Sequence, residues 1–100
     1  MTTKNKTSRD LFRDYGELTF GEVLRSFRLA DEMTQTEFAR KLGISAANLC
    51  DLEKGRKLPS PARAAKMAMK LGLPEPLMIQ LALQGQLEQA HLAYKVSVAA

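Results

Sequence analysis

The sequence predicts an all-α fold, and three observations favour this fold class. Apolar residues recur every three to four positions from residue 20 to residue 90, which is the spacing of helices that bury one face. The sequences T-F-G-E at 19–22 and T-Q-T-E at 34–37 are capping boxes, in which a threonine and a glutamate satisfy the first free N–H groups of a helix. Gly43 and Gly72 each follow a stretch with helical spacing and are suited to end a helix there. We therefore expect five short helices.

The elements at the beginning of the chain can be assigned in order. Residues 1–7 are polar and basic, so we expect a mobile arm there, followed by a short helix over residues 8–15. The first helix of the main bundle begins after the cap Thr19, and the second begins after the cap Thr34. The residues expected to face inward are Phe20, Val23, Leu24 and Phe27 in the first of these helices and Phe38, Ala39 and Leu42 in the second.

Three further helices and one strand complete the prediction. The third helix spans residues 45–54, and the basic loop R-K-L-P-S-P leads from it to a fourth helix that ends at Gly72. The fifth helix runs from about residue 77 to about residue 90, with an interruption at Gly85. Residues 94–98 alternate apolar and polar, which predicts a short C-terminal strand. The inward residues are expected to be Leu49 and Leu52 in the third helix and Ala64, Met67, Ala68 and Leu71 in the fourth.

Composition narrows the classes of function. Cys50 and His91 are the single cysteine and the single histidine, so neither an intramolecular disulfide nor a metal site of these residues is expected. No general base lies near a nucleophile and no glycine-rich phosphate loop is present, so we expect no enzyme activity and no cofactor. The first ten residues lack the apolar run of a signal peptide, and no apolar stretch approaches the length of a membrane span. We therefore expect a cytoplasmic protein of bacterial or phage type, associated with the nucleoid and not with a membrane.

Positive charge is concentrated in the middle of the chain. The formal net charge is +4, and residues 35–73 contain eight lysines and arginines against three acidic residues. Residues 74–100 contain one lysine and two glutamates. A basic central region indicates a polyanionic partner, although net charge alone does not distinguish one polyanion from another.

Residues 34–55 have the layout of a helix-turn-helix, in which two short helices are joined by a tight turn. This unit needs a small residue beside the turn, a glycine within it and apolar anchors on the second helix. The residues that fit are Ala39, Gly43, Leu49 and Leu52.

The pattern around this unit extends over about half of the chain. Its members are Phe20, Leu24, Arg28, Thr34, Gln35, Glu37, Ala39, Leu42, Gly43, Ile44, Ser45, Leu52, Glu53, Gly55, Pro59, Ser60, Leu71 and Gly72. In these residues the stretch from Phe20 to Leu73 resembles the XRE, or Cro/CI, family of lambda-repressor-like DNA-binding domains. The resemblance implies a five-helix bundle that binds double-stranded DNA, in many members as a homodimer.

The resemblance also assigns roles to individual residues. It implies that Gln35 touches the DNA backbone and that Arg28 and Glu53 form a structural ion pair between the first and third helices. It places Ser45, Ala46, Ala47 and Asn48 in the part of the reading helix that meets base edges in the major groove. The alanines can offer only methyl contact and Asn48 can pair with adenine, so DNA shape is expected to carry part of the specificity.

Charged residues after the reading helix complete the predicted interface. Lys54, Arg56 and Lys57 follow it directly and are suited to phosphate contacts. Asp51 departs from the glutamine or arginine common on this face in the family. Because an acidic side chain repels phosphate, we expect it to make a structural hydrogen bond instead.

These observations predict a sequence-specific DNA-binding transcriptional repressor. We expect an N-terminal arm and short helix at 1–18, a helix-turn-helix DNA-binding domain at 19–73, and a dimerisation or partner-binding segment at 74–100. Because the chain ends soon after the DNA-binding unit, one hypothesis is an autoregulating antitoxin whose partner is a cognate toxin protein. Two alternatives stay open. One is a Cro-like regulator of a phage or plasmid, and the other is a protein-interaction module that has lost DNA binding.

Overall fold

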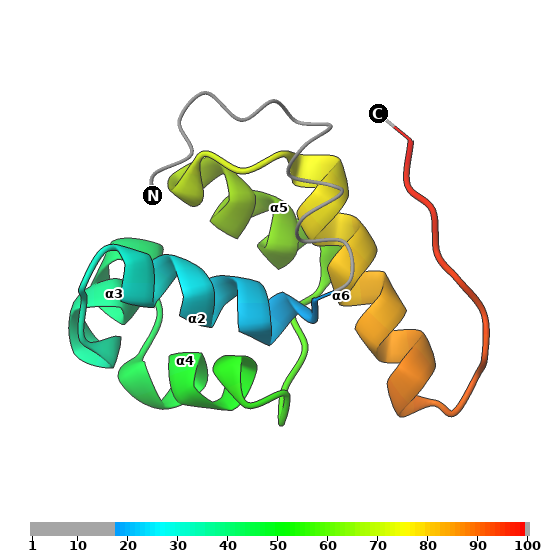
Figure 1. Ribbon diagram of the computed structural model, residues 1–100, viewed down its shortest axis with the longest axis horizontal. Coiled ribbons are helices and arrows are strands. Elements are labelled where there is room, and N and C mark those ends of the chain that lie inside the picture. Colours follow the sequence, from blue (N-terminus) through cyan, green and yellow to red (C-terminus); the bar gives the residue numbers. More distant parts are fainter. Residues whose placement is uncertain (1–17, 100) are drawn as a thin grey trace.

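The computed structural model describes residues 18–99, which form a bundle of five α-helices (Figure 1). The expected arm at residues 1–7 and the expected short helix at 8–15 lie outside the described residues. In chain order, the helices are α2 (Phe20–Ala30), α3 (Gln35–Leu42), α4 (Ala46–Glu53), α5 (Pro61–Leu71) and α6 (Glu75–Gln89). The all-α class predicted from the sequence is confirmed.

Local sequence signals set the helix ends. Thr19 and Thr34 both form complete capping boxes, in which the threonine hydroxyl accepts the N–H of the glutamate three residues later and that glutamate accepts the threonine N–H. The hydroxyls of Ser45 and Ser60 cap α4 and α5. Gly43 ends α3 in the left-handed region, with φ of 75°, which a side chain would disfavour. This residue turns the chain from α3 into α4.

All five helices contribute to one apolar core. α2 lies between α4 and α5 in the view of Figure 1, and it packs against both α4 and α6. α6 packs mainly on α5. The largest fully buried side chains are Phe20, Val23, Leu24, Phe38, Leu49, Leu77 and Met78. The second helix of the helix-turn-helix is thus held by the core through Leu49, while α6 is part of the same core.

The structure corrects the sequence prediction for α6. The helix begins at Glu75, two residues before the predicted start, because Pro76 occupies the first turn, where its missing N–H costs nothing. It continues through Gly85 without interruption. A Cβ at Gly85 would lie 2.9 Å from a methyl carbon of Leu58, so the glycine gives room for the side chain that the α4–α5 loop packs against the helix.

The prediction of a short strand at 94–98 is wrong. Residues 92–99 run back alongside α6 in an irregular extended form (Figure 1). The side-chain amide of Gln84 donates to the carbonyl of Tyr94 at 2.9 Å and accepts the N–H of Val96 at 2.8 Å. The carboxamide oxygen of Gln80 accepts the N–H of Val98 at 3.2 Å. Helix side chains therefore take the hydrogen bonds that a neighbouring strand would have made.

Candidate nucleic-acid interface

The expected reading helix, α4, lies at the edge of the bundle, where one of its faces is free of other elements (Figure 1). Leu49 and Leu52 hold its opposite face in the core. α2 packs directly against the backbone of α4 at Gly21. A Cβ at this position would lie only 2.8 Å from the carbonyl oxygen of Glu53 and even closer to that of Leu52, so only glycine leaves room for this contact. Backbone contact between the two helices therefore determines how far α4 projects from the domain.

The four residues predicted to read bases differ in their availability. Ser45 is exposed, but its hydroxyl accepts the N–H of Asn48 at 3.0 Å as the helix cap. Ala46 packs partly against the core. Ala47 is exposed, and the side chain of Asn48 is half-buried at the surface. The residues best placed to approach bases are therefore Ala47 and Asn48.

The three predicted phosphate-binding residues lie in the loop that follows α4. Lys54, Arg56 and Lys57 are all exposed, and Gly55 turns the chain between them with φ of 76°. The carbonyl of Asp51 accepts the N–H of Arg56 at 2.9 Å and that of Lys57 at 3.3 Å, so the loop is folded back onto α4. The cations are thereby held beside the exposed face of α4.

Side chains connect this loop to the reading face. Asp51 Oδ1 lies 3.5 Å from Arg56 Nη1, and Asp51 Oδ2 lies 3.6 Å from Lys57 Nζ. Lys57 Nζ also donates to Asn48 Oδ1 at 3.3 Å. The sequence led us to expect that Asp51 accepts a structural hydrogen bond, but not that both of its oxygens would face the predicted phosphate-binding residues. The pairs cross a glycine turn, so helical spacing does not reveal them.

Arg28 and Glu53, paired by the resemblance, are in contact. Arg28 Nε donates to Glu53 Oε2 at 2.8 Å and Nη2 donates to Oε1 at 3.0 Å, a two-pronged geometry that suits arginine and carboxylate. Arg28 also donates to the carbonyl of Met33 at 3.2 Å. The Glu53 side chain is 3% exposed and that of Arg28 13%, so the pair links α2 to the end of α4 away from water.

Gln35 lies at the start of α3 with its side chain directed into this ion pair. Its Nε2 donates to Glu53 Oε1 at 3.1 Å. Burial would raise the pKa of Glu53, but hydrogen bonds from Arg28 and Gln35 and the positive charges of Arg28 and Arg25 outweigh it and hold that pKa below the ordinary value. The hydrogen bonds that Arg28 donates to Glu53 raise the pKa of Arg28. In this structure Gln35 therefore has a positioning contact that the sequence did not predict.

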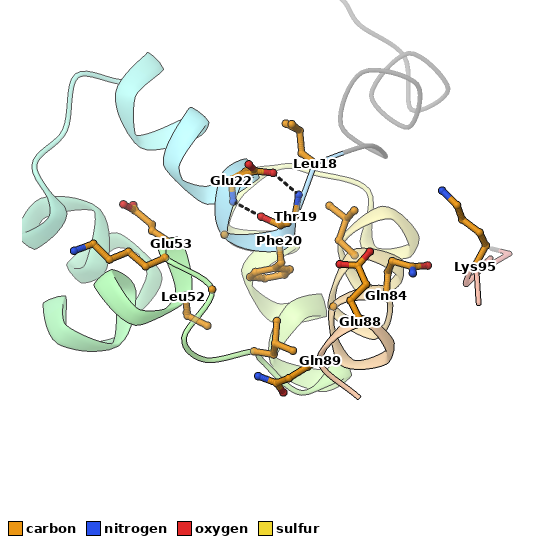
Figure 2. Close-up of a pocket in the computed structure, with 16 residues that line it drawn as sticks. Leu18, Thr19, Phe20, Glu22, Leu52, Glu53, Gln84, Glu88, Gln89 and Lys95 are labelled. Atoms are coloured by element: carbon orange, nitrogen blue, oxygen red, sulfur yellow. Dashed lines mark hydrogen bonds between the residues drawn. The ribbon is translucent and has the colours of Figure 1, made fainter. Parts of the chain in front are cut away.

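A groove of about 550 Å³ lies between the start of α2, the end of α4 and α6 (Figure 2). Its floor includes the ring of Phe20, and the two hydrogen bonds of the Thr19–Glu22 capping box lie at its rim. Gln84 and Glu88 of α6 line the opposite side. The Thr19 hydroxyl in this groove is already engaged as a helix cap.

Within residues 18–99, no three His, Cys, Asp or Glu side chains are grouped so that they could hold a metal ion. Among the helices of that same region, none is both long enough and apolar enough to cross a membrane.

Most of the helical bundle is similar to a known family of domains. A family model described as a helix-turn-helix domain matches residues 19–81, from the first capping box into α6. The chain belongs to this helix-turn-helix family. The match includes α3 and α4, whose turn and caps are described above, and it also takes in the first half of α6.

The curated relatives of this helix-turn-helix protein include named transcriptional regulators. The HTH-type transcriptional repressor RghR of Bacillus subtilis (strain 168) is 36% identical over 77 residues, which are 75% of this chain and 55% of the relative. The ImmF control region 10 kDa protein of Bacillus phage phi105 is 36% identical over 53 residues, 53% of this chain and 59% of that one. YazB of Bacillus subtilis, an uncharacterized HTH-type transcriptional regulator, is 44% identical over 43 residues, 43% of this chain and 62% of the relative.

The chain thus covers little more than half the length of each of these helix-turn-helix relatives. No solved structure matches the chain. The family assignment therefore rests on the sequence matches.

Proposed function

We propose that the protein is a sequence-specific DNA-binding transcriptional repressor that inserts the beginning of α4 into the major groove. The observation that carries this proposal is the position of Ala47 and Asn48 on the free face of α4, next to the exposed cations Arg56 and Lys57. Residues that can touch base edges and residues that can bind phosphate thus share one surface, as a major-groove reader requires. A relative named as a transcriptional repressor supports the same proposal.

Paired substitutions test the two parts of this surface separately. Arg56→Ala with Lys57→Ala is expected to weaken binding to the preferred site and to random duplex DNA nearly equally, because phosphate contacts carry no base information. The slope of log K against log salt should become shallower by about one unit for each lost contact. An unchanged slope would remove these two residues from the interface.

Asn48→Ala is the matched test of base reading. It is expected to cost about 1–3 kcal/mol on the preferred site and little on random DNA. Equal losses on both sequences would mean that Asn48 contacts the DNA backbone or supports the fold, and does not read bases. The preferred site itself is obtained by incubating the purified protein with a random duplex library and sequencing the retained fragments. If no sequence is enriched, specific DNA binding is refuted.

We further propose that residues 74–100 form the interface of a two-fold homodimer. The inner face of α6 belongs to the protein's own core, but Ile79, Leu83 and Leu87 are half-exposed on it, and Leu92 and Tyr94 are exposed after it. This set is more apolar than one surface helix needs. A dimer would place two reading helices about 34 Å apart, in successive major grooves.

The extended segment after α6 supports the same assembly. The N–H groups of Val96 and Val98 are bonded to α6, so the N–H groups of Lys95 and Ser97, which alternate with them, belong to the opposite edge of the segment. A second copy could pair there in antiparallel fashion. Light scattering on the full chain and on a chain ending at Ala90 tests this, because that truncation keeps the core residues of α6. If the full chain and the truncated chain are both monomeric at tens of micromolar, the dimer is refuted.

A phage-type regulator is the second candidate, because a relative carries the name of a phage control-region protein. The antitoxin hypothesis has no such observation in its favour and stays a prediction. Co-expression with the product of a neighbouring reading frame, followed by purification of the tagged protein, tests it directly. A stable, stoichiometric complex with an RNA-cleaving partner would favour the antitoxin, and the absence of any complex would count against it.

A further inference from the structure

The cluster of Asp51, Arg56, Lys57 and Asn48 at the reading face has a consequence beyond the proposed function, on which it rests. We propose that the Asp51 carboxylate competes with DNA phosphate for Arg56 and Lys57, and that this competition lowers the affinity for DNA of any sequence. Asp51 thus sets the general affinity for DNA by reducing backbone binding.

The geometry of the carboxylate is that of a phosphate substitute. Each of its two oxygens faces a different cation, Oδ1 toward Arg56 and Oδ2 toward Lys57, at 3.5 and 3.6 Å. A DNA phosphate also presents anionic oxygens to such donors, so the same N–H groups serve either partner. The backbone N–H groups of Arg56 and Lys57 donate to the Asp51 carbonyl, and these hydrogen bonds keep both residues near Asp51 whether or not the side chains are engaged. Competition is therefore local and always present.

The distances indicate that this competition is moderate. Charge-assisted hydrogen bonds from nitrogen to oxygen are usually about 2.7–2.9 Å long, so both pairs here are loose. The cations are 60% exposed, whereas Asp51 is 27% exposed. The cations can therefore swing out to phosphate while the carboxylate stays on the helix. Exposed pairs of this kind contribute little individually, so Asp51 is expected to attenuate binding without blocking it.

Lys57 connects the competition to base reading. Its Nζ lies between Asp51 and Asn48, and it donates to Asn48 Oδ1. Paired recognition of adenine by asparagine uses that oxygen as well as the amide nitrogen. Transfer of Lys57 to phosphate frees Asn48 Oδ1 for a base. A site that offers Asn48 a suitable base then recovers the cost of breaking the Asp51 pairs, whereas random DNA does not.

The test uses the full chain with Asp51→Asn and, as the matched control, Asp31→Asn. Asp31 is an exposed aspartate that also has a loose lysine partner, Lys41 at 3.6 Å, and it lies at the end of α2 outside the cluster. Both variants change the net charge equally. Asp51→Asn is expected to bind random duplex DNA about three- to tenfold more tightly than Asp31→Asn at low salt, as the loss of two weak competing pairs predicts. The preferred site should gain by a similar factor, because the same two pairs are broken on either DNA.

Two further measurements isolate the cause. Combined with Arg56→Ala and Lys57→Ala, the Asp51→Asn change should have no effect beyond that of Asp31→Asn. Persistence of the gain in that background would mean that Asp51 simply repels DNA, which overturns the proposal. Asp51→Ala, which removes both oxygens, should act in the same direction as Asp51→Asn. A loss of affinity confined to the preferred site would instead make Asp51 a base reader, and would also overturn it.

A phosphate-bearing resin keeps this result separate from the proposed function. On phosphocellulose, Asp51→Asn is expected to elute at higher salt than both the wild type and Asp31→Asn. The salt concentration at elution depends on the affinity for phosphate and does not depend on any DNA sequence. If the library selection enriches no sequence, specific repression is refuted while the resin still decides the competition. Equal elution of the two aspartate variants would overturn the role proposed for Asp51.

Discussion

Gly21 and Gly85 offer a matched pair of substitutions that test how α4 is positioned. Both glycines lie within helices, so replacing either by alanine should gain up to about 1 kcal/mol of helix propensity. They differ in what the new Cβ would meet. At Gly21 the neighbours are the carbonyl oxygens of Leu52 and Glu53, which are backbone atoms. At Gly85 the neighbour is the end of the Leu58 side chain.

The gain in helix propensity and the cost of the new contact balance differently at the two positions. At Gly21, α2 and α4 must move apart, and overpacking of this kind costs about 1–3 kcal/mol or more. Because the overlap is with backbone of the reading helix, we expect the upper end and a net loss of about 2 kcal/mol. At Gly85, a rotamer adjustment of Leu58 costs about 0.5–1.5 kcal/mol, which the propensity gain offsets.

Thermal unfolding of the two variants provides the assay. A loss of about 2 kcal/mol lowers the Tm of a domain this size by about 8–16 °C, whereas Gly85→Ala should stay within a few degrees of the wild type. Gly21→Ala should also weaken binding to the preferred site more than binding to random DNA, because α4 is displaced. Equal Tm values for the two variants would refute the argument that backbone contact at Gly21 sets the position of α4.

Two other predictions concern side chains that bridge helices. Glu53→Gln leaves Arg28 charged and largely buried, so we expect a loss of about 3 kcal/mol at neutral pH, measured by urea unfolding. Because the pKa of Glu53 is lowered in the folded state, its stabilisation is complete above the ordinary glutamate pKa and is lost as the pH falls through the folded pKa. The difference between variant and wild type should thus shrink from about pH 6 to about pH 3, and a constant difference would contradict the assignment. Lys70 Nζ donates to the carbonyl of Leu42 at 2.9 Å at the C-terminal end of α3, so Lys70→Met should cost about 0.5–1.5 kcal/mol by the same assay. Arg63→Met, an exposed cation at the start of α5, is its control and should have little effect.

Local signals allowed most of the fold to be predicted from the sequence. A capping box involves residues only three positions apart, so Thr19 with Glu22 and Thr34 with Glu37 could be recognised without tertiary information. The left-handed turn at Gly43 is equally local. Predictions failed where distant partners decide the outcome. The alternation at 94–98 suits a strand, but the amides of Gln80 and Gln84 bind that backbone instead.

The candidate site was predictable in outline and not in its connections. The positions of Asn48, Arg56 and Lys57 followed from the helix-turn-helix pattern. Their shared contacts with Asp51 depend on the Gly55 turn, which brings the loop back over α4. The contact of Gln35 with Glu53 joins two helices and depends on side-chain rotamers. Periodicity and spacing contain no information of that kind.

The two faces of α4 also bear on how readily the proposed DNA-binding surface could acquire a new target. Leu49 and Leu52 hold the helix in the core, while Ala47 is exposed and Asn48 lies at the surface. Exchanges on the outer face should therefore change the folding free energy little, since surface substitutions usually alter it by less than about 0.5 kcal/mol. A lineage can vary positions 47 and 48 while Gly21 keeps the helix at the same depth. New recognition can then arise by drift among folded proteins, without a compensating change in the interior.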